Sequence, residues 1–404
     1  MPSRTRSVET ALLVSVLLAA ATGCAVGGGA SGGAAVPGAT PPGTAPGRSA
    51  APSGAPGGAS APAGFTLVAS GDVLPHDSVI RRAAEDAGGH GYDFRPMLSG
   101  AKPVVSGADL AVCHMETVYG EKGGPYTGYP AFKSPPEVAA ALGATGYDSC
   151  STASNHTLDD GAAGLGRTLD ALDRAGVRHA GSARTAEEAA RPALMEAGGA
   201  TVAQLAYTYD TNGHPMPEGR PWAVGLLDER QVIADARAAR AAGADVVVVS
   251  LHWGTEWQTE PDGRQLSLAR TLTASRTGGR PDVDLIIGTH AHVPQAYEKV
   301  NGTWVIYGMG DQIAGDMVDH RGVFDPRGNQ SSIGRFTFAP PRTPGGRWEV
   351  TRAEFVPQWF DTARGRVVNL GADAGDPRRA AIRDTIRQVV LGRGAGEDGL
   401  VMGR

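Results

Sequence analysis

The sequence predicts a large α/β domain, and two observations lead to this prediction. Short apolar runs alternate with amphipathic segments along most of the chain, which is the rhythm of β-α units. Several of these runs end in acids, asparagine or histidine, as expected where a ligand binds at the carboxyl edge of an open sheet. About 340 residues follow a low-complexity N-terminal part, which is enough for one large domain with insertions.

Residues 1–24 have the pattern of a lipoprotein-type signal peptide. Arg4 and Arg6 precede an apolar run at 11–21, which is too short to span a bilayer because roughly 20 residues are needed. The run ends in Ala-Thr-Gly-Cys, which looks like a lipobox in which Cys24 would be acylated. An ordinary secretory signal is the alternative. We expect export and, with lipidation, a location on the outer face of the cytoplasmic membrane.

Composition restricts the remaining possibilities. Residues 25–63 are almost wholly Gly, Ala, Pro, Ser and Thr, which predicts a disordered linker. The net charge of -5 comes from interspersed acids and bases, so nucleic acid is not an expected partner. Cys113 and Cys150 lie in apolar runs and are expected to be buried thiols, although an oxidising compartment also permits a disulfide.

The domain is expected over residues 64–360, before a C-terminal helix and tail at 361–404. Its first half predicts strands at 65–69, 109–113 and 147–152, where apolar residues are continuous or alternate. Helices are predicted at 78–87 and 161–175 from helical spacing, the second ended by Gly176. Another begins at Ser134-Pro135-Pro136-Glu137, which combines capping-box spacing with prolines in a first turn.

The second half continues the alternation. Strands are predicted at 201–207, 245–251, 283–287 and 304–307, and the unbroken valine run at 245–251 suits a strand buried on both faces. Helices are predicted at 228–242 and 265–274 from their spacing. Residues 334–338 and 348–356 are typical of a β-hairpin, and 378–390 of a helix.

Polar residues at the strand ends form the candidate site. They follow five predicted strands in chain order: Asp72, Glu116, Asn155 with His156, His252, and His290 with His292. Each one alone also has an ordinary explanation as a turn residue, a helix cap or a core histidine. The two last histidines are a stronger signal, because alternating residues of an extended segment point the same way and both imidazoles could reach one metal pair.

This order resembles the ligand order of calcineurin-like metallophosphoesterases, and the chain is more closely similar to the CapA family. The similar stretches, between about 65 and 356, are GDVLPH, SGADLAVCHMET, YPAFKSPPEVAAAL, STASNHTLDDG, VVVVSLHWGTEW, DLIIGTHAHVPQ and VIYGMGD. The resemblance implies a four-layer metallophosphoesterase-like α/β sandwich, two mixed sheets flanked by helices. It also implies a role in making or exporting an anionic envelope polymer, poly-γ-glutamate being the family's namesake substrate.

The resemblance also implies two divalent metal ions. Asp72, Glu116 and His292 would hold one ion and Asn155, His252 and His290 the other, with Glu116 as the bridge. His76 is a further candidate ligand. Carboxylate, amide and imidazole together suit Mn²⁺, Zn²⁺ or Fe rather than Ca²⁺.

Three segments depart from the family pattern and bear on metal preference and occupancy. The chain has His114-Met115-Glu116 where the family has Asn-Leu-Glu, and Gly310-Asp311-Gln312 where it has Gly-Asn-Phe. It also has Ser154 in place of the first of two asparagines before the histidine. Asp311 is a candidate partner for a ligand histidine.

Catalytic and substrate-binding roles are assigned to neighbours of these ligands. His156 is the candidate proton donor, and Asp159 either orients its imidazole or caps the following helix. Lys133 could attract a carboxylate or phosphate. Phe132 and Tyr209 are expected in loops at the same end of the sheet, as candidate substrate contacts. Trp253 and Trp257 flank His252 and either wall the pocket or pack beneath it.

A purely structural role for the cluster is a third interpretation, but the completeness of the ligand set argues against it, and two functions are left. One is a metal-dependent hydrolase that acts on a phosphoester or an anionic envelope polymer. The other is a non-catalytic polymer-binding or assembly factor that keeps the same fold. Expected partners are the polymer, the membrane through the lipid anchor, and capsule-synthesis membrane proteins. His156 separates the two functions, because pure binding has little use for a proton donor.

Overall fold

The computed structural model describes residues 63–343, 345–372 and 375–404. The predicted signal peptide with Cys24, and the predicted linker apart from residue 63, lie outside these residues. Among the helices in the described ranges, none has the length and apolar character needed to cross a bilayer.

The first sheet is mixed and has β1 at its centre. Its strands run in the order β16 (Arg366–Asn369), β15 (Glu349–Asp361), β14 (Gln330–Ala339), β1 (Phe65–Leu74), β2 (Leu110–Met115), β3 (Ser149–Ser151) and β4 (Arg178–Ala180). The strands β1 to β4 are parallel, whereas β14, β15 and β16 are antiparallel to their neighbours. Two further strands pair in parallel with this sheet, β13 (Asp311–Ala314) with β1 and β17 (Leu400–Met402) with β15.

The second sheet has a parallel centre and antiparallel edges. Its order is β11 (Tyr297–Val300), β12 (Thr303–Ile306), β10 (Leu285–Thr289), β7 (Val246–His252), β6 (Ala200–Thr208) and β5 (Ala193–Ala197). The outer strands β11 and β5 are antiparallel to β12 and β6. A small ribbon joins β8 (Arg276–Thr277) to β9 (Arg280–Pro281).

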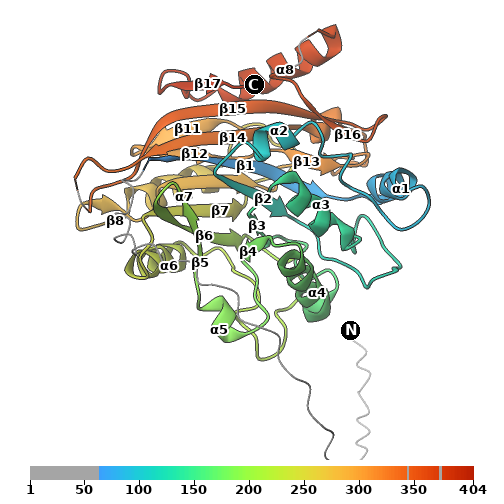
Figure 1. The fold of residues 1–404 in the computed structure, drawn as a ribbon, viewed down its shortest axis with the longest axis horizontal. Helices are drawn as coiled ribbons and strands as arrows, with labels where there is room; N and C mark the ends of the chain where they lie inside the picture. The colour runs from blue at the N-terminus through green and yellow to red at the C-terminus, as the bar shows by residue number, and fades with distance from the viewer. Residues whose placement is uncertain (1–62, 344, 373–374) are drawn as a thin grey trace, which may run out of the picture. The chain divides into compact units, whose positions relative to one another are not determined.

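The two sheets face each other, and helices cover their outer faces (Figure 1). Leu67 of β1 points into the core between the sheets, whereas Val68 packs against the helices on the other side. The first sheet is covered by α1 (Asp77–Asp86), α2 (Lys102–Val105), α3 (Glu137–Thr145) and α4 (Gly161–Arg174). The second is covered by α6 (Glu229–Ala241) and α7 (Gly263–Ala274). The predicted four-layer α/β sandwich is therefore confirmed.

The valine run at 245–251 illustrates why these strands are visible in the sequence. Val246 and Val248 lie in the core between the sheets, and Val247 and Val249 pack under α6 and α7. Because both faces are buried, apolar residues do not alternate with polar ones. Continuous or alternating apolar runs predicted nine of the 17 strands in the described residues, with ends that differ by up to five residues.

Residues 361–404 belong to the same compact unit as the rest of the domain. In Figure 1 the C-terminal α8 (Pro377–Val390) and β17, in red, lie alongside β15. Ile386 and Val390 of α8 and Leu400 of β17 join the core between the sheets. The remaining short elements are α5 (Ala186–Ala189) and a 3₁₀ helix, η1 (Pro326–Asn329).

One local prediction was wrong, and one alternative that the sequence left open is decided by the structure. The capping box before α3 does not form: Pro136 is the N-cap without a side-chain cap, and Ser134 Oγ instead lies 2.7 Å from Thr117 Oγ1. Cys113 and Cys150 are not free thiols, because they form a disulfide. They lie opposite each other on the parallel strands β2 and β3, which brings their side chains together.

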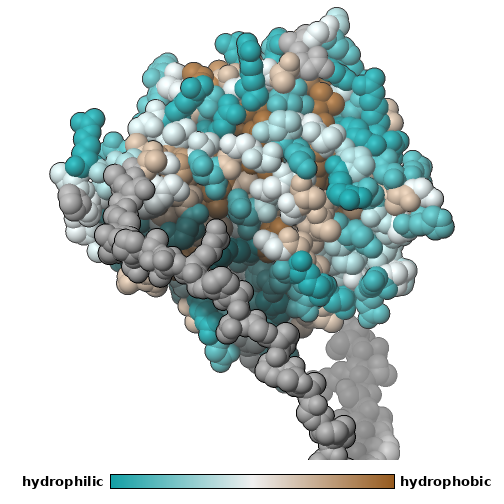
Figure 2. Space-filling model, viewed as in Figure 1, coloured by the Kyte–Doolittle hydropathy of each residue, from teal (hydrophilic) through white to brown (hydrophobic). Residues whose placement is uncertain are grey.

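The surface drawn in Figure 2 is mixed. Hydrophilic residues predominate where the described residues are visible, and apolar residues lie in separate small areas. This is the usual composition of a surface in contact with water.

Candidate metal centre

The predicted ligands converge because parallel strands of both sheets end at the same place. Asp72 lies opposite His114 on the paired strands β1 and β2, and His252 lies opposite Thr289 on β7 and β10. The two sheets meet where the imidazoles of His114 and His252 stack, with ring centroids 4.7 Å apart. The six predicted ligands are buried: Asp72, Glu116, Asn155, His252, His290 and His292.

One group of donors is rich in carboxylates. Asp72, Glu116, His292 and Asp311 each offer a ligand atom, and these atoms all lie within 4.8 Å of one another. Asp311 Oδ1 lies 3.0 Å from His292 Nδ1, so Asp311 does partner a histidine, as expected. It also belongs to the donor group itself, which the sequence did not indicate. We call these four residues the carboxylate-rich position.

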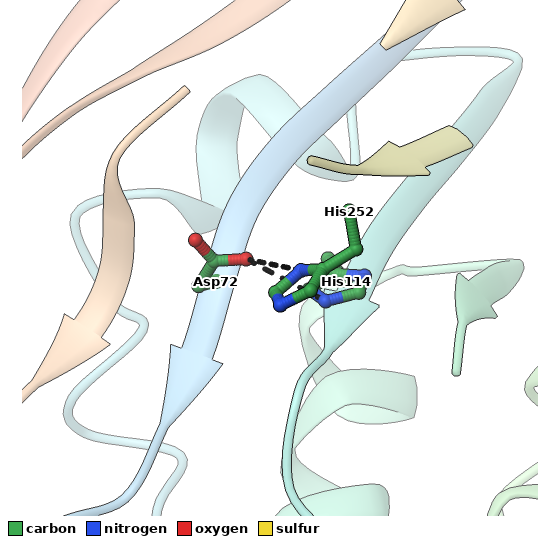
Figure 3. A group of neighbouring side chains, drawn as sticks. All are labelled: Asp72, His114 and His252. Atoms are coloured by element: carbon green, nitrogen blue, oxygen red, sulfur yellow. Dashed lines mark ion pairs between the residues drawn. The ribbon is translucent and has the colours of Figure 1, made fainter. Parts of the chain in front are cut away.

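A second group is rich in imidazoles. Asp72, His114 and His252 satisfy the same 4.8 Å criterion, and Figure 3 shows the Asp72 carboxylate beside the two imidazole rings, directed toward a nitrogen of each. The distances from Asp72 Oδ1 are 3.6 Å to His114 Nε2 and 4.0 Å to His252 Nδ1. His252 Nε2 lies 2.9 Å from Asn155 Oδ1 and 3.8 Å from Glu116 Oε1. We call Asp72, His114 and His252 the imidazole-rich position.

Two further donors were not predicted as ligands. His114 stands where the family pattern has asparagine, although it precedes Glu116 by two residues and strand periodicity puts both on one side. Glu256 groups with His290 and His292 in a third set of donors within 4.8 Å. It lies four residues after His252, in a loop where no periodicity indicates its direction.

Several of these buried atoms have no hydrogen-bond partner among the described residues. They are Asp72 Oδ1, His114 Nε2, both carboxylate oxygens of Glu116, His290 Nδ1 and Asp311 Oδ2. Isolated carboxylates in an apolar interior are unstable unless a cation or a proton compensates them. Unpartnered oxygens and nitrogens that converge in this way fit a divalent metal ion.

Burial and crowding of charged groups also shift the pKa values of the acids and histidines at the centre. Burial, and then the neighbouring carboxylate of Asp311, raises the pKa of Asp72 well above its usual value. Burial, and then Asp72, does the same to the pKa of Glu116. Burial lowers the pKa of His114 to about 3, with a further contribution from His292, so this imidazole is neutral at neutral pH. Neutral imidazole is the form that binds metals.

His290 and His292 do not lie on an extended segment, contrary to the prediction from their spacing. Strand β10 ends at Thr289, and the two histidines follow in bends with φ of 90° and 57° rather than in an extended segment. Left-handed backbone is rare for such residues and concentrates at functional sites. His290 is tied to the centre by its backbone N–H, which donates to Asp72 Oδ2 at 3.1 Å.

His156 and Asp159 form a separate hydrogen-bonded pair beside the ligands. His156 Nδ1 lies 2.7 Å from Asp159 Oδ2, which also accepts the Phe132 backbone N–H at 2.7 Å. The N-cap of α4 is Asp160, not Asp159, so of the two roles considered for Asp159 the structure has the orientation of His156. The Phe132 ring is buried and meets the His156 ring nearly at right angles.

Two candidate substrate contacts, Lys133 and Trp253, have partners away from the metal centre. Lys133 forms an ion pair with Asp160 at 3.6 Å. Trp253 is 1% exposed and its indole N–H donates to the Tyr307 carbonyl, so it packs beneath the second sheet rather than walling a pocket.

Tyr209 and Trp257 do reach the centre, with ring centroids 4.4 Å from His290 and 5.9 Å from His292 respectively. His76 belongs to none of the three donor groups, and its Nδ1 lies 3.1 Å from the Leu74 carbonyl oxygen.

Curated relatives and solved structures resemble parts of this chain. It is 28% identical over 161 residues to the "PGA biosynthesis protein CapA" of Bacillus subtilis (strain 168), covering 40% of each chain. It is 26% identical over 178 residues to the "Capsule biosynthesis protein CapA" of Bacillus anthracis, covering 43% of this chain and 42% of the relative. A "probable polyglutamine synthesis accessory protein" of Mycobacterium tuberculosis (strain H37Rv) is 27% identical over 192 residues, with 45% and 49% covered. The matches thus span less than half the length of these relatives.

Among solved structures, the calcineurin-like phosphoesterase YfkN from Bacillus subtilis aligns with a TM-score of 0.44 at 14% identity, covering 80% of this chain and 97% of that one. The NAD nucleotidase of Haemophilus influenzae aligns with a TM-score of 0.42 at 13% identity, covering 84% and 64%. The model of the family described as "Bacterial capsule synthesis protein PGA_cap" matches residues 66–316. Because this match covers more than half of the 404 residues, the chain belongs to the bacterial capsule synthesis protein family PGA_cap.

Proposed function

We propose that this protein is an envelope hydrolase that cleaves or trims an anionic polymer of the poly-γ-glutamate type through a two-metal site. The observation that carries the proposal is the convergence of buried acids and imidazoles whose donor atoms lack other partners. The names of the Bacillus relatives, which refer to capsule and PGA biosynthesis, support the choice of polymer.

The metal ions would be divalent, with Mn²⁺, Zn²⁺ or Fe as candidates. The carboxylate-rich and imidazole-rich positions share Asp72, which supports two neighbouring ions rather than one. When bound, such ions polarise the bond to be cleaved and lower the pKa of a bound water toward about 7.

The chain's own residues supply the proton. Asp159 holds His156 through Nδ1, which leaves Nε2 as the ring atom free to reach a leaving group. Asn155 connects His156 to the metal centre: the Asn155 side chain contacts His252, and Asn155 directly precedes His156 in the chain. Tyr209, whose ring contacts His290, would border the substrate.

We also propose export to the outer face of the cytoplasmic membrane, with Cys24 as the lipid anchor and capsule-synthesis membrane proteins as partners. The signal-peptide pattern of residues 1–24 supports export. The Cys113–Cys150 disulfide supports it independently, because disulfides persist in oxidising compartments and are rare in the cytosol.

The test combines elemental analysis with two cleavage assays. The purified protein would be assayed with p-nitrophenyl phosphate and with poly-γ-glutamate, before and after chelation and after metal is restored. We expect two metals per chain and turnover that disappears with the chelator and returns with metal. If the protein binds metal and poly-γ-glutamate but hydrolyses neither substrate, the proposed hydrolase is wrong and a non-catalytic polymer-binding or assembly factor takes its place. Absence of bound metal would overturn the proposal altogether.

A further inference from the structure

A repeated arrangement orients two histidines, one from each sheet. His252 ends β7, and its Nδ1 lies 3.0 Å from Thr289 Oγ1 on the neighbouring parallel strand β10. The Thr289 hydroxyl lies 3.5 Å from the carbonyl oxygen of Leu251, the residue before His252. In the tautomer that donates from Nδ1 to this hydroxyl, Nε2 is unprotonated, faces the oxygens Asn155 Oδ1 and Glu116 Oε1, and is the ring atom left to bind a metal ion.

His114 has the same surroundings on the first sheet. It lies near the end of β2, and its Nδ1 is 2.7 Å from Ser151 Oγ on the neighbouring parallel strand β3. The Ser151 hydroxyl lies 3.4 Å from the carbonyl oxygen of Cys113, the residue before His114. The disulfide joins Cys113 to Cys150, one residue before each member of this pair, and holds the two strands together there.

The outer nitrogen of His114 points at the metal centre. Its Nε2 is buried without a hydrogen-bond partner among the described residues, as is Asp72 Oδ1, which lies 3.6 Å away. Two ligand atoms that each bind a tetrahedral Zn²⁺ at 2.0–2.1 Å are about 3.3 Å apart. A shift of a few tenths of an ångström would therefore place both atoms on one ion. A core histidine without this role would leave a buried polar atom uncompensated.

We propose that His114 is a metal ligand, oriented by Ser151, and that it makes the imidazole-rich position selective for a borderline ion such as Zn²⁺ or Fe²⁺. The carboxylate-rich position offers mainly oxygen donors and suits a harder ion such as Mn²⁺. The two positions would then differ in metal preference. This inference rests on the proposed metal-dependent function, and it adds a ligand and a selectivity that the predicted ligand set lacks.

The experiment measures Zn²⁺ and Mn²⁺ affinities of the full chain by competition with a chromophoric chelator, with metal content checked by elemental analysis. In His114→Asn the side-chain amide can still reach Ser151, but the atom equivalent to Nε2 is gone. In His114→Gln an oxygen can take the place of Nε2. Ser151→Ala removes only the orienting hydroxyl, and His90→Asn, at an exposed histidine, is the matched control.

We expect His114→Asn to weaken one Zn²⁺ site by more than about 100-fold, and Ser151→Ala by about 10–100-fold, the usual cost of losing an orienting partner. In both variants Mn²⁺ affinity should fall by less than about 10-fold. His114→Gln should reduce the ratio of Zn²⁺ affinity to Mn²⁺ affinity. His90→Asn should match wild type. Wild-type protein that binds two metals while His114→Asn keeps full Zn²⁺ affinity would refute the role of His114 and leave the proposed function standing. Wild-type protein that binds no metal would refute both.

A measurement on wild-type protein covers the case in which the variants do not fold. In a crystal structure of the Zn²⁺-loaded chain we expect His114 Nε2 at about 2.0–2.1 Å from an anomalous zinc peak. A peak beside His252 with His114 Nε2 beyond bonding distance would overturn the inference.

Discussion

The disulfide between Cys113 and Cys150 gives a prediction about stability. It closes a loop with a sequence separation of 37 residues and is buried at both ends. In the chain-entropy model a loop of this length lowers the entropy of the unfolded chain enough to stabilise the fold by about 4 kcal/mol. For a domain of this size the unfolding entropy is about 0.7 kcal/mol per kelvin, so losing the bond should lower Tm by about 6 °C.

The assay compares oxidised wild-type protein with the same protein unfolded, reduced and refolded in reductant, so that both sulfur atoms remain in place. Peptide mapping by mass spectrometry would first verify the linked peptides. The Cys113→Ala/Cys150→Ala double variant is the control, and its Tm should not respond to reductant. Equal Tm values for the oxidised and reduced wild type would refute the reasoning. A reduced protein that also loses Zn²⁺ affinity would connect the disulfide to the His114–Ser151 pair.

Three further predictions concern single side chains. His156→Ala should reduce hydrolysis by about 10²–10⁴-fold with metal content unchanged, and loss of metal in parallel would contradict its role as proton donor. Asp159→Ala leaves the buried Phe132 N–H without its acceptor and should cost about 1–3 kcal/mol in urea unfolding, so an unchanged midpoint would count against that contact. The pKa of Glu116 is raised in the folded state, so the protonated carboxyl stabilises the metal-free fold. This stabilisation is complete below the unfolded pKa of about 4.3 and is lost as pH rises through the folded pKa. Metal-free Glu116→Gln cannot ionise and should therefore gain in Tm over metal-free wild type as pH rises from 5 to 8, whereas a difference independent of pH would contradict the shift.

The sequence predicted the central strands well because burial on both faces gives continuous apolar runs. Within the described residues it did not predict eight short strands of two to five residues. Among them are β4 and β16, which are defined by pairing with a neighbour rather than by composition. The capping box failed for a related reason, since the partner of Ser134 is Thr117, and the contact depends on the tertiary fold. The disulfide required the register of β2 against β3, which spacing alone does not supply.

In the candidate site, the position of side chains at strand ends was predictable and their final direction was not. Asp72, Glu116 and His252 were found because parallel strands bring their carboxyl ends together. His114 could have been found from strand periodicity. The left-handed backbone at His290 and His292 could not have been predicted from the sequence, because it is imposed by tertiary contacts such as the one between the His290 N–H and Asp72.

The central strand of the first sheet has consequences for when the protein can fold. β1 pairs with β14, where Phe65 lies opposite Phe338, and with β13, where Asp72 lies opposite Asp311. Both partners follow by well over 200 residues, so neither the sheet nor the carboxylate-rich position can form until most of the domain is available. Folds dominated by such distant pairings form slowly. A chain exported as proposed would thus stay unfolded during passage, and would take its metals from whichever ions are available outside the cytoplasm.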